Sequence, residues 1–321
     1  MKTILEDNIS YDTKIKDFGV DSVNKRIITT GDKLIFLKEG KIEKKVAGKI
    51  KNCEVIRYIK EKNQLFVSSI FFVSTQNGKV YKCDGRRKKI LEEVYDFERT
   101  PEVVDFTTGG KIIFIENNTL CSYDVNTKES YITQSFSENM TKGNYRIFTS
   151  GENVLHEKSN RINIFDSKLE KIFDIKTENN HIYSKIVGIE YLAGTDAGEI
   201  EIWNIIEAEM YNSIKISNSR ITFIEKNDKN YFIGTGTGDL IITDETFKIQ
   251  VIQNVFKNEI TKICVIEDEI FVLGVENRIV KFKIIDETNE VKNNIQRMEF
   301  MEKYNIHEDY YDFFAMENVA A

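Results

Sequence analysis

The chain has few of the residue types from which catalytic sites are built. Its 321 residues include three histidines, one tryptophan and one proline. Histidine is the side chain that most readily exchanges a proton near neutral pH, so candidates for a general base are few. The sequence also has no GxSxG, HExxH or GxxxxGK[ST] motif. These absences favour a protein that is not an enzyme.

Cysteine is equally scarce. Cys53, Cys83, Cys121 and Cys264 occur singly in strand-like segments, with no CxxC pair and no histidine at metal-ligand spacing. Free cysteine is among the most buried residue types. We therefore expect four buried, reduced thiols, no metal site and no other cofactor.

One glycine-rich segment, residues 234–238, has the composition of a phosphate-binding loop. Such loops place their glycines before the amino terminus of a helix, whose N–H groups hold the phosphate. Here Leu240-Ile241-Ile242 follows and indicates a strand. The segment is therefore interpreted as a hairpin turn.

Neither a secretory signal nor a membrane helix is apparent. Residues 1–10 include Glu6 and Asp7 and contain no long apolar run. The longest dense apolar stretch, Leu65–Val73, is far shorter than the roughly 20 residues that a membrane helix needs. We expect an intracellular protein, in the cytoplasm or in the nucleus and nucleolus, without a membrane partner.

Charge is distributed unevenly along the chain. The net charge is +7 over residues 1–100, −8 over residues 101–285 and −6 over residues 286–321. Arg86, Arg87, Lys88 and Lys89 follow Asp84-Gly85, which indicates an exposed turn. Two interpretations stay open: the cluster contacts RNA phosphates, or it forms a solvated basic rim.

The strongest signal in the sequence is a repeat. Short β-rich runs recur at spacings of 46, 40, 42, 38, 40 and 39 residues, beginning at Leu34, Val80, Leu120, Ile162, Ile200, Leu240 and Ile279. This period is typical of the four-stranded blades of a β-propeller. The sequence therefore predicts an all-β, seven-bladed β-propeller of antiparallel blades over residues 1–285, followed by a short extension, residues 286–321.

Polar turns separate the runs. Gln76-Asn77-Gly78 lies between Phe71–Thr75 and Val80–Cys83, which is a hairpin signature. Two Gly-Thr pairs, Gly194-Thr195 and Gly234-Thr235, are expected on inner strands, where little room is left near the axis.

Residues 192–204, Leu-Ala-Gly-Thr-Asp-Ala-Gly-Glu-Ile-Glu-Ile-Trp-Asn, resemble the consensus of the WD-repeat family. Trp203-Asn204 stands where that family has Trp-Asp, and Phe72–Asp84 and Phe232–Asp244 look like weaker copies. The resemblance implies a divergent WD-repeat propeller. It also implies a buried relay in which His181 is joined to Thr195 and Trp203, with Asp196 one position earlier than the family pattern requires.

A closed ring needs a fourth strand for the last blade. The resemblance favours residues 3–9 for this role, and the competing choice is Ile295–Met301.

For a propeller without a catalytic constellation, we expect function to lie in partner binding. The predicted contact residues lie in turns between second and third strands and in the loops that lead into the blades: Asn77, Asn117, Ser159, His181, Asp196, Arg220, Thr237 and Glu276.

The carboxyl-terminal extension contains an acidic aromatic run with Tyr310, Tyr311, Phe313 and Phe314. Two roles stay open, docking on a partner protein or folding back onto basic blades one and two.

The element Asp312-Phe313-Phe314 is similar to the ending of a nucleolar WD-repeat family. The resemblance implies a non-catalytic scaffold that binds other proteins of an assembly in ribosome biogenesis. The alternatives are a non-catalytic subunit that positions RNA for an RNA-modifying enzyme, and a propeller that binds a small molecule or lipid.

Overall fold

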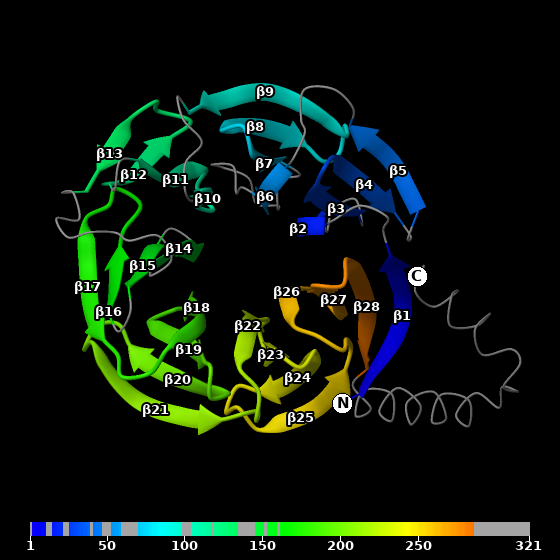
Figure 1. The fold of residues 1–321 in the computed structure, drawn as a ribbon, viewed down its shortest axis with the longest axis vertical. Helices are drawn as coiled ribbons and strands as arrows, with labels where there is room; N and C mark the ends of the chain where they lie inside the picture. Colours follow the sequence, from blue (N-terminus) through cyan, green and yellow to red (C-terminus); the bar gives the residue numbers. More distant parts are fainter. Residues whose placement is uncertain are drawn as a thin grey trace, which may run out of the picture.

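A computed structural model shows seven four-stranded antiparallel sheets arranged in a ring (Figure 1). It describes residues 2–10, 15–21, 26–38, 41–46, 53–58, 70–97, 104–116, 119–133, 145–150, 153–158 and 161–285. Within these ranges every regular element is a strand, and no helix is long and apolar enough to cross a membrane. The prediction of an all-β, seven-bladed propeller is confirmed.

Each blade is a sheet of four antiparallel strands, numbered here from the axis outward, and in blades one to six the four strands are consecutive along the chain. The inner strands of blades one to seven are β2 (Ile15–Asp21), β6 (Cys53–Tyr58), β10 (Val104–Phe106), β14 (Tyr145–Ser150), β18 (His181–Val187), β22 (Ile221–Lys226) and β26 (Ile260–Ile266). The second strands are β3 (Arg26–Gly31), β7 (Ile70–Thr75), β11 (Lys111–Glu116), β15 (Asn153–Lys158), β19 (Glu190–Thr195), β23 (Asn230–Thr235) and β27 (Glu269–Gly274).

The repeated runs of the sequence are the third strands. These are β4 (Leu34–Lys38), β8 (Lys79–Asp84), β12 (Thr119–Asp124), β16 (Arg161–Phe165), β20 (Glu199–Asn204), β24 (Asp239–Asp244) and β28 (Arg278–Ile285). The outer strands are β5 (Lys41–Val46), β9 (Lys89–Asp96), β13 (Ser130–Ile132), β17 (Lys171–Lys176), β21 (Glu209–Lys215), β25 (Ile249–Asn254) and, for blade seven, β1 (Lys2–Ser10).

Burial follows the position of a strand in its blade. All six residues of β23 are buried, because both faces of a second strand are covered by neighbouring blades. In the outer strand β21, six of the seven residues are exposed. Apolar runs therefore mark second and third strands, whereas outer strands have a weak hydrophobic pattern.

The core is divided among the spaces between blades. Seven clusters of buried apolar side chains each join two neighbouring blades of the described structure. In one of them Phe36 of blade one meets Phe71 of blade two edge-on, with ring centroids 6.2 Å apart. Removal of these faces from water is the main force that holds the blades together.

Blade seven closes the ring with strands from both ends of the described chain. β1 pairs with β28 antiparallel from Lys2–Ile285 to Ser10–Arg278 (Figure 1). Near the axis, Lys262 of β26 donates to Asp17 Oδ1 of β2 at 2.5 Å, which joins blade seven to blade one. The closing strand is thus amino-terminal, and the competing segment Ile295–Met301 lies outside the described residues.

The two Gly-Thr pairs lie on second strands, β19 and β23, and not on inner strands as expected. Their glycines are nevertheless in close quarters. A Cβ atom at Gly194 would come within 2.5 Å of Ile221 in blade six, and one at Gly234 within 2.7 Å of Ile260 in blade seven. The room beside each glycine is therefore limited by the inner strand of the next blade and not by the propeller axis.

Candidate functional site

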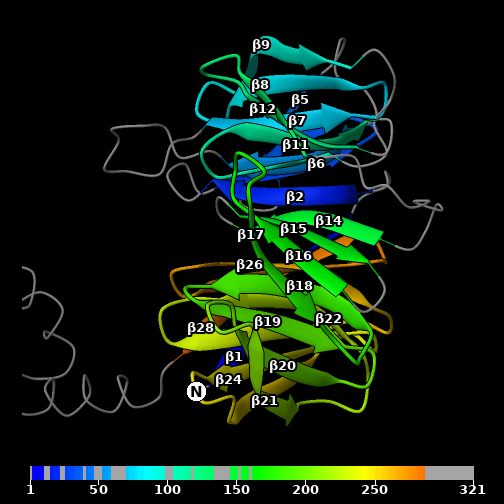
Figure 2. The same cartoon turned by 90° about the vertical axis from the view of Figure 1, so that its left-hand side faces the viewer.

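The turns between second and third strands lie on the same face of the ring as the loops that connect successive blades. Three turn carbonyls accept N–H groups from these loops: Gly78 from Phe97 at 2.9 Å, Gly198 from Ile216 at 3.0 Å and Gly238 from Val255 at 2.9 Å. We call the surface formed by these turns and loops the interblade face, and the opposite surface the hairpin face. Figure 2 shows the ring from the side.

Three turns of the interblade face have the same construction. The hydroxyl of Thr75, Thr195 or Thr235 accepts the N–H four residues later, at 3.0–3.1 Å. The intervening glycine has a φ of 82–84°, a conformation that costs glycine little. The two residues between threonine and glycine are therefore held in fixed positions at the surface.

We expect Gly238→Ala to lower the free energy of unfolding by roughly 2–4 kcal/mol. The alanine would have to adopt φ 83°, which is strained for a residue with a Cβ atom. Its Cβ atom would also overlap the carbonyl oxygens of Phe256 and Asn258. Gly188→Ala is the matched control, because Gly188 has φ 64° but nothing within 4 Å of the added atom, so only about 1 kcal/mol is expected. Urea denaturation of the two variants measures the difference, and equal losses would contradict the tight contact at Gly238.

Five of the predicted contact residues lie on the interblade face. Asn77, Asp196, Arg220 and Thr237 are exposed, and Glu276 is half-buried. Four of these side chains make contacts within the chain: Asn77 accepts from Thr75, Arg220 pairs with Glu259 at 2.5 Å, Thr237 donates to Asp239 at 2.8 Å, and Glu276 accepts the Lys257 N–H at 3.1 Å. Asn117, Ser159, Tyr310, Tyr311, Phe313 and Phe314 lie outside the described residues.

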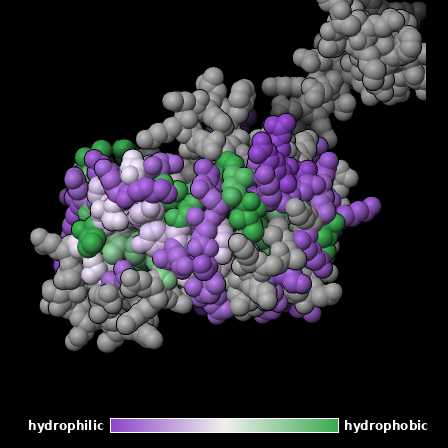
Figure 3. Space-filling view, turned by 90° about the horizontal axis from the view of Figure 1, so that it is seen from above, coloured by the Kyte–Doolittle hydropathy of each residue, from purple (hydrophilic) through white to green (hydrophobic). Residues whose placement is uncertain are grey.

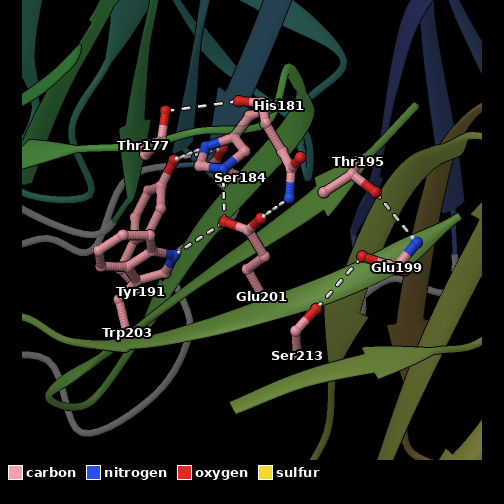
Figure 4. A network of polar contacts seen from close by, with 10 residues as sticks. Thr177, His181, Ser184, Tyr191, Thr195, Glu199, Glu201, Trp203 and Ser213 are labelled. Carbon is pink, nitrogen blue, oxygen red and sulfur yellow. Dashed lines mark hydrogen bonds and ion pairs between the residues drawn. The ribbon is translucent and has the colours of Figure 1, made fainter. Parts of the chain in front are cut away.

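His181 lies beneath this face, in a buried polar network of blade five (Figure 4). Its Nε2 is 2.9 Å from Glu201 Oε2, and its Nδ1 is 3.0 Å from the Tyr191 hydroxyl. Trp203 Nε1 donates to the same Glu201 oxygen at 3.1 Å, and Asn179 donates to the other. One carboxylate therefore joins the loop before blade five to strands β18 and β20.

Glu201 is a buried anion held by its donors. Burial alone would raise the pKa of Glu201, but hydrogen bonds from His181, Asn179 and Trp203 lower it below the ordinary value of 4.5. Only 2% of the residue is exposed, so its charge acts on neighbours within the blade. The network fixes the position of the loop that carries Asn179 and leads into blade five.

The network differs from the relay that the resemblance implies. Trp203 and His181 are both in it, as expected. The Thr195 hydroxyl instead accepts the Glu199 N–H, and Asp196 is exposed on the turn. Glu201, which the sequence analysis missed, takes the central place. The only signal for it was a carboxylate between two buried isoleucines, Ile200 and Ile202.

The basic cluster lies at the turn from β8 to β9 on the hairpin face, and Arg86, Arg87 and Lys89 are exposed. Lys88 pairs with Glu43 of blade one at 3.0 Å, and Arg87 approaches Asp84 at 3.5 Å. Part of the positive charge of the cluster is thus balanced within the chain.

The cysteines that the structure describes are free thiols. Cys83 and Cys121 are buried and Cys264 is partly buried, whereas the side chain of Cys53 lies outside the described part. Burial raises the pKa of Cys121 to about 11 and that of Cys264 to about 12, so both thiols stay protonated and weakly nucleophilic. Over the described ranges, His, Cys, Asp and Glu form no group of three able to hold a metal ion.

No protein-family model matches the chain, and no curated protein matches its sequence. The ring of seven blades places the protein among the seven-bladed β-propellers, with a fold consistent with the WD-repeat type.

Proposed function

We propose that the protein is a non-catalytic scaffold that binds partner proteins through its interblade face. The observation that supports this proposal is the repeated turn. Its backbone and threonine hydrogen bonds hold Asn77, Asp196 and Thr237 at the surface of one face. Because the backbone of these turns is positioned before binding, little backbone conformational entropy is lost when a partner contacts them. Propellers use such broad faces for recognition through many contacts.

The more specific proposal is a divergent WD-repeat scaffold of an intracellular protein or ribonucleoprotein assembly, with ribosome production as its setting. Its support is the Trp203-Asn204 resemblance, the presence of His181 and Trp203 in one network, and the Asp312-Phe313-Phe314 element. Contact with RNA through Arg86–Lys89, and a small-molecule or lipid site, remain alternative proposals.

Affinity purification of the tagged full chain from its native cell tests the scaffold proposal. The triple variant Asp196→Ala, Arg220→Ala, Thr237→Ala is expected to recover partner proteins at least about tenfold less well, because contacts at the interface centre dominate binding. The matched control, Lys168→Ala, Asp228→Ala, Lys229→Ala, changes three exposed residues of the hairpin face and should recover them normally.

Quantitative mass spectrometry with and without ribonuclease separates the alternatives. Partners lost only after ribonuclease treatment would favour RNA contact. Equal recovery by the wild type and both triple variants would contradict binding through the interblade face.

A further inference from the structure

Blade five carries an apolar residue at a turn position where other blades are polar. Ile206 donates its N–H to the Asn204 side chain at 2.9 Å. The equivalent bonds, to Asp124, Asp166 and Asp244, are made by Asn126, Lys168 and Thr246 at 2.8–2.9 Å. The same turn thus presents isoleucine in blade five and a polar side chain in three others, and 63% of Ile206 is exposed.

The neighbouring turn of blade five repeats this difference. Ile189 lies directly before β19 and is 54% exposed. The residues directly before β23 and β27 are Lys229 and Asp268. The Ile205 N–H donates to the Ile189 carbonyl at 3.0 Å, so the two turns lie side by side on the hairpin face.

The outer strand β21 extends this apolar surface. Met210 and Tyr211 lie at a register shift, a β-bulge opposite Ile202 and Trp203, and they are 46% and 56% exposed. The Tyr211 hydroxyl donates to the Glu190 carboxylate, which fixes the ring near the turns. We call Ile189, Ile206, Met210 and Tyr211 the blade-five patch.

The charges that blade five itself places around the patch are acidic, and Lys226 of blade six, near the Tyr231 ring, pairs with Glu245 at 3.7 Å. The sequence has no lysine, arginine or histidine between Lys185 and Lys215. Glu207 and Glu209 are exposed next to Ile206 and Met210, and within the described structure neither has an ion-pair partner. Figure 3 shows the rim from another side, where hydrophilic and hydrophobic residues are interspersed.

We propose that the blade-five patch is a docking site for a protein segment with large apolar side chains flanked by lysine or arginine. Exposed apolar side chains that lie together mark interaction surfaces, and the carboxylates of Glu207 and Glu209, without an ion-pair partner among the described residues, favour a cationic partner. Tyrosine and methionine add contact area, and methionine adapts to the shape of its partner. This proposal rests on the scaffold function proposed above and adds a second binding surface to it. The turns of the blade-five patch lie on the hairpin face, opposite the interblade face with Asn77, Asp196 and Thr237.

Selection of random short peptides on the immobilised full chain tests the site. Enriched peptides are expected to combine apolar and basic residues. In fluorescence anisotropy they should bind the double variant Ile206→Ser, Met210→Ser at least about tenfold more weakly than the wild type. Their affinity for the wild type should fall as salt is added. Ile252→Ser is the matched control: Ile252 is 61% exposed on β25, the outer strand of blade six, and its loss should leave binding unchanged.

Unchanged affinity in the double variant, enrichment of acidic peptides, or no enriched class would overturn the blade-five site. If the selected peptides lose binding only to the triple variant of Asp196, Arg220 and Thr237, the blade-five site is also overturned. That result would support binding through the interblade face. The scaffold proposal fails separately, if purification from the native cell recovers no partner.

Discussion

Removal of residues 1–10 is expected to lower the free energy of unfolding by about 5 kcal/mol or more and the melting temperature by on the order of 10 °C. These residues include β1, which pairs with β28 along its whole length. Without β1, one edge of β28 loses its backbone partners, and an exposed edge strand pairs readily with other chains. Circular dichroism during heating, with light scattering, measures both the transition and the aggregation.

Two controls separate loss of the strand from loss of its side chains. A synthetic peptide of residues 2–10 should raise the melting temperature of the shortened chain in proportion to its concentration, and a scrambled peptide should not. Leu5→Ser should change stability little, because Leu5 is 57% exposed. A shortened chain that melts with the wild type would show that β1 does not hold the ring closed.

The architecture could be predicted because it depends on patterns that recur. The third strands begin within one residue of the seven runs identified from the period, since each blade must bury similar apolar side chains between two neighbours. The Asn77-Gly78 turn was identified for a local reason, because few residues other than glycine adopt φ 82° without strain. The pairing partner of β28 was left with two choices, because strand pairing across the whole chain leaves no local signal.

The candidate site could be predicted only in part. Exposed turn residues such as Asp196 and Thr237 follow from the hairpin pattern. The partners of His181 do not, because they depend on the register of β18 against β19 and of β19 against β20. That register brings Glu201 beside His181 and keeps Thr195 at the turn. The blade-five patch was missed because its outer strand has too weak a hydrophobic pattern to reveal which side chains stay exposed.

Near neutral pH, Glu201→Ala is expected to lower the free energy of unfolding by about 3–5 kcal/mol. The substitution leaves the N–H groups of Trp203 and His181 buried without their carboxylate, which is costly in a medium of low dielectric constant. Glu199→Ala is the matched control two residues earlier on β20: its side chain accepts only a long bond of 3.4 Å from Ser213, so a loss below about 1 kcal/mol is expected. Urea denaturation measures both.

The difference between wild type and Glu201→Ala should depend on pH in one direction. The pKa of Glu201 is lower in the folded chain than its ordinary value of 4.5, so the stabilisation is complete above pH 4.5. As the pH falls through the lower folded value, the wild-type carboxyl takes up a proton and its advantage over the alanine variant shrinks. A difference that stays constant across this acidic range, or that grows as the pH falls, would show that Glu201 is not held as an anion by His181, Asn179 and Trp203.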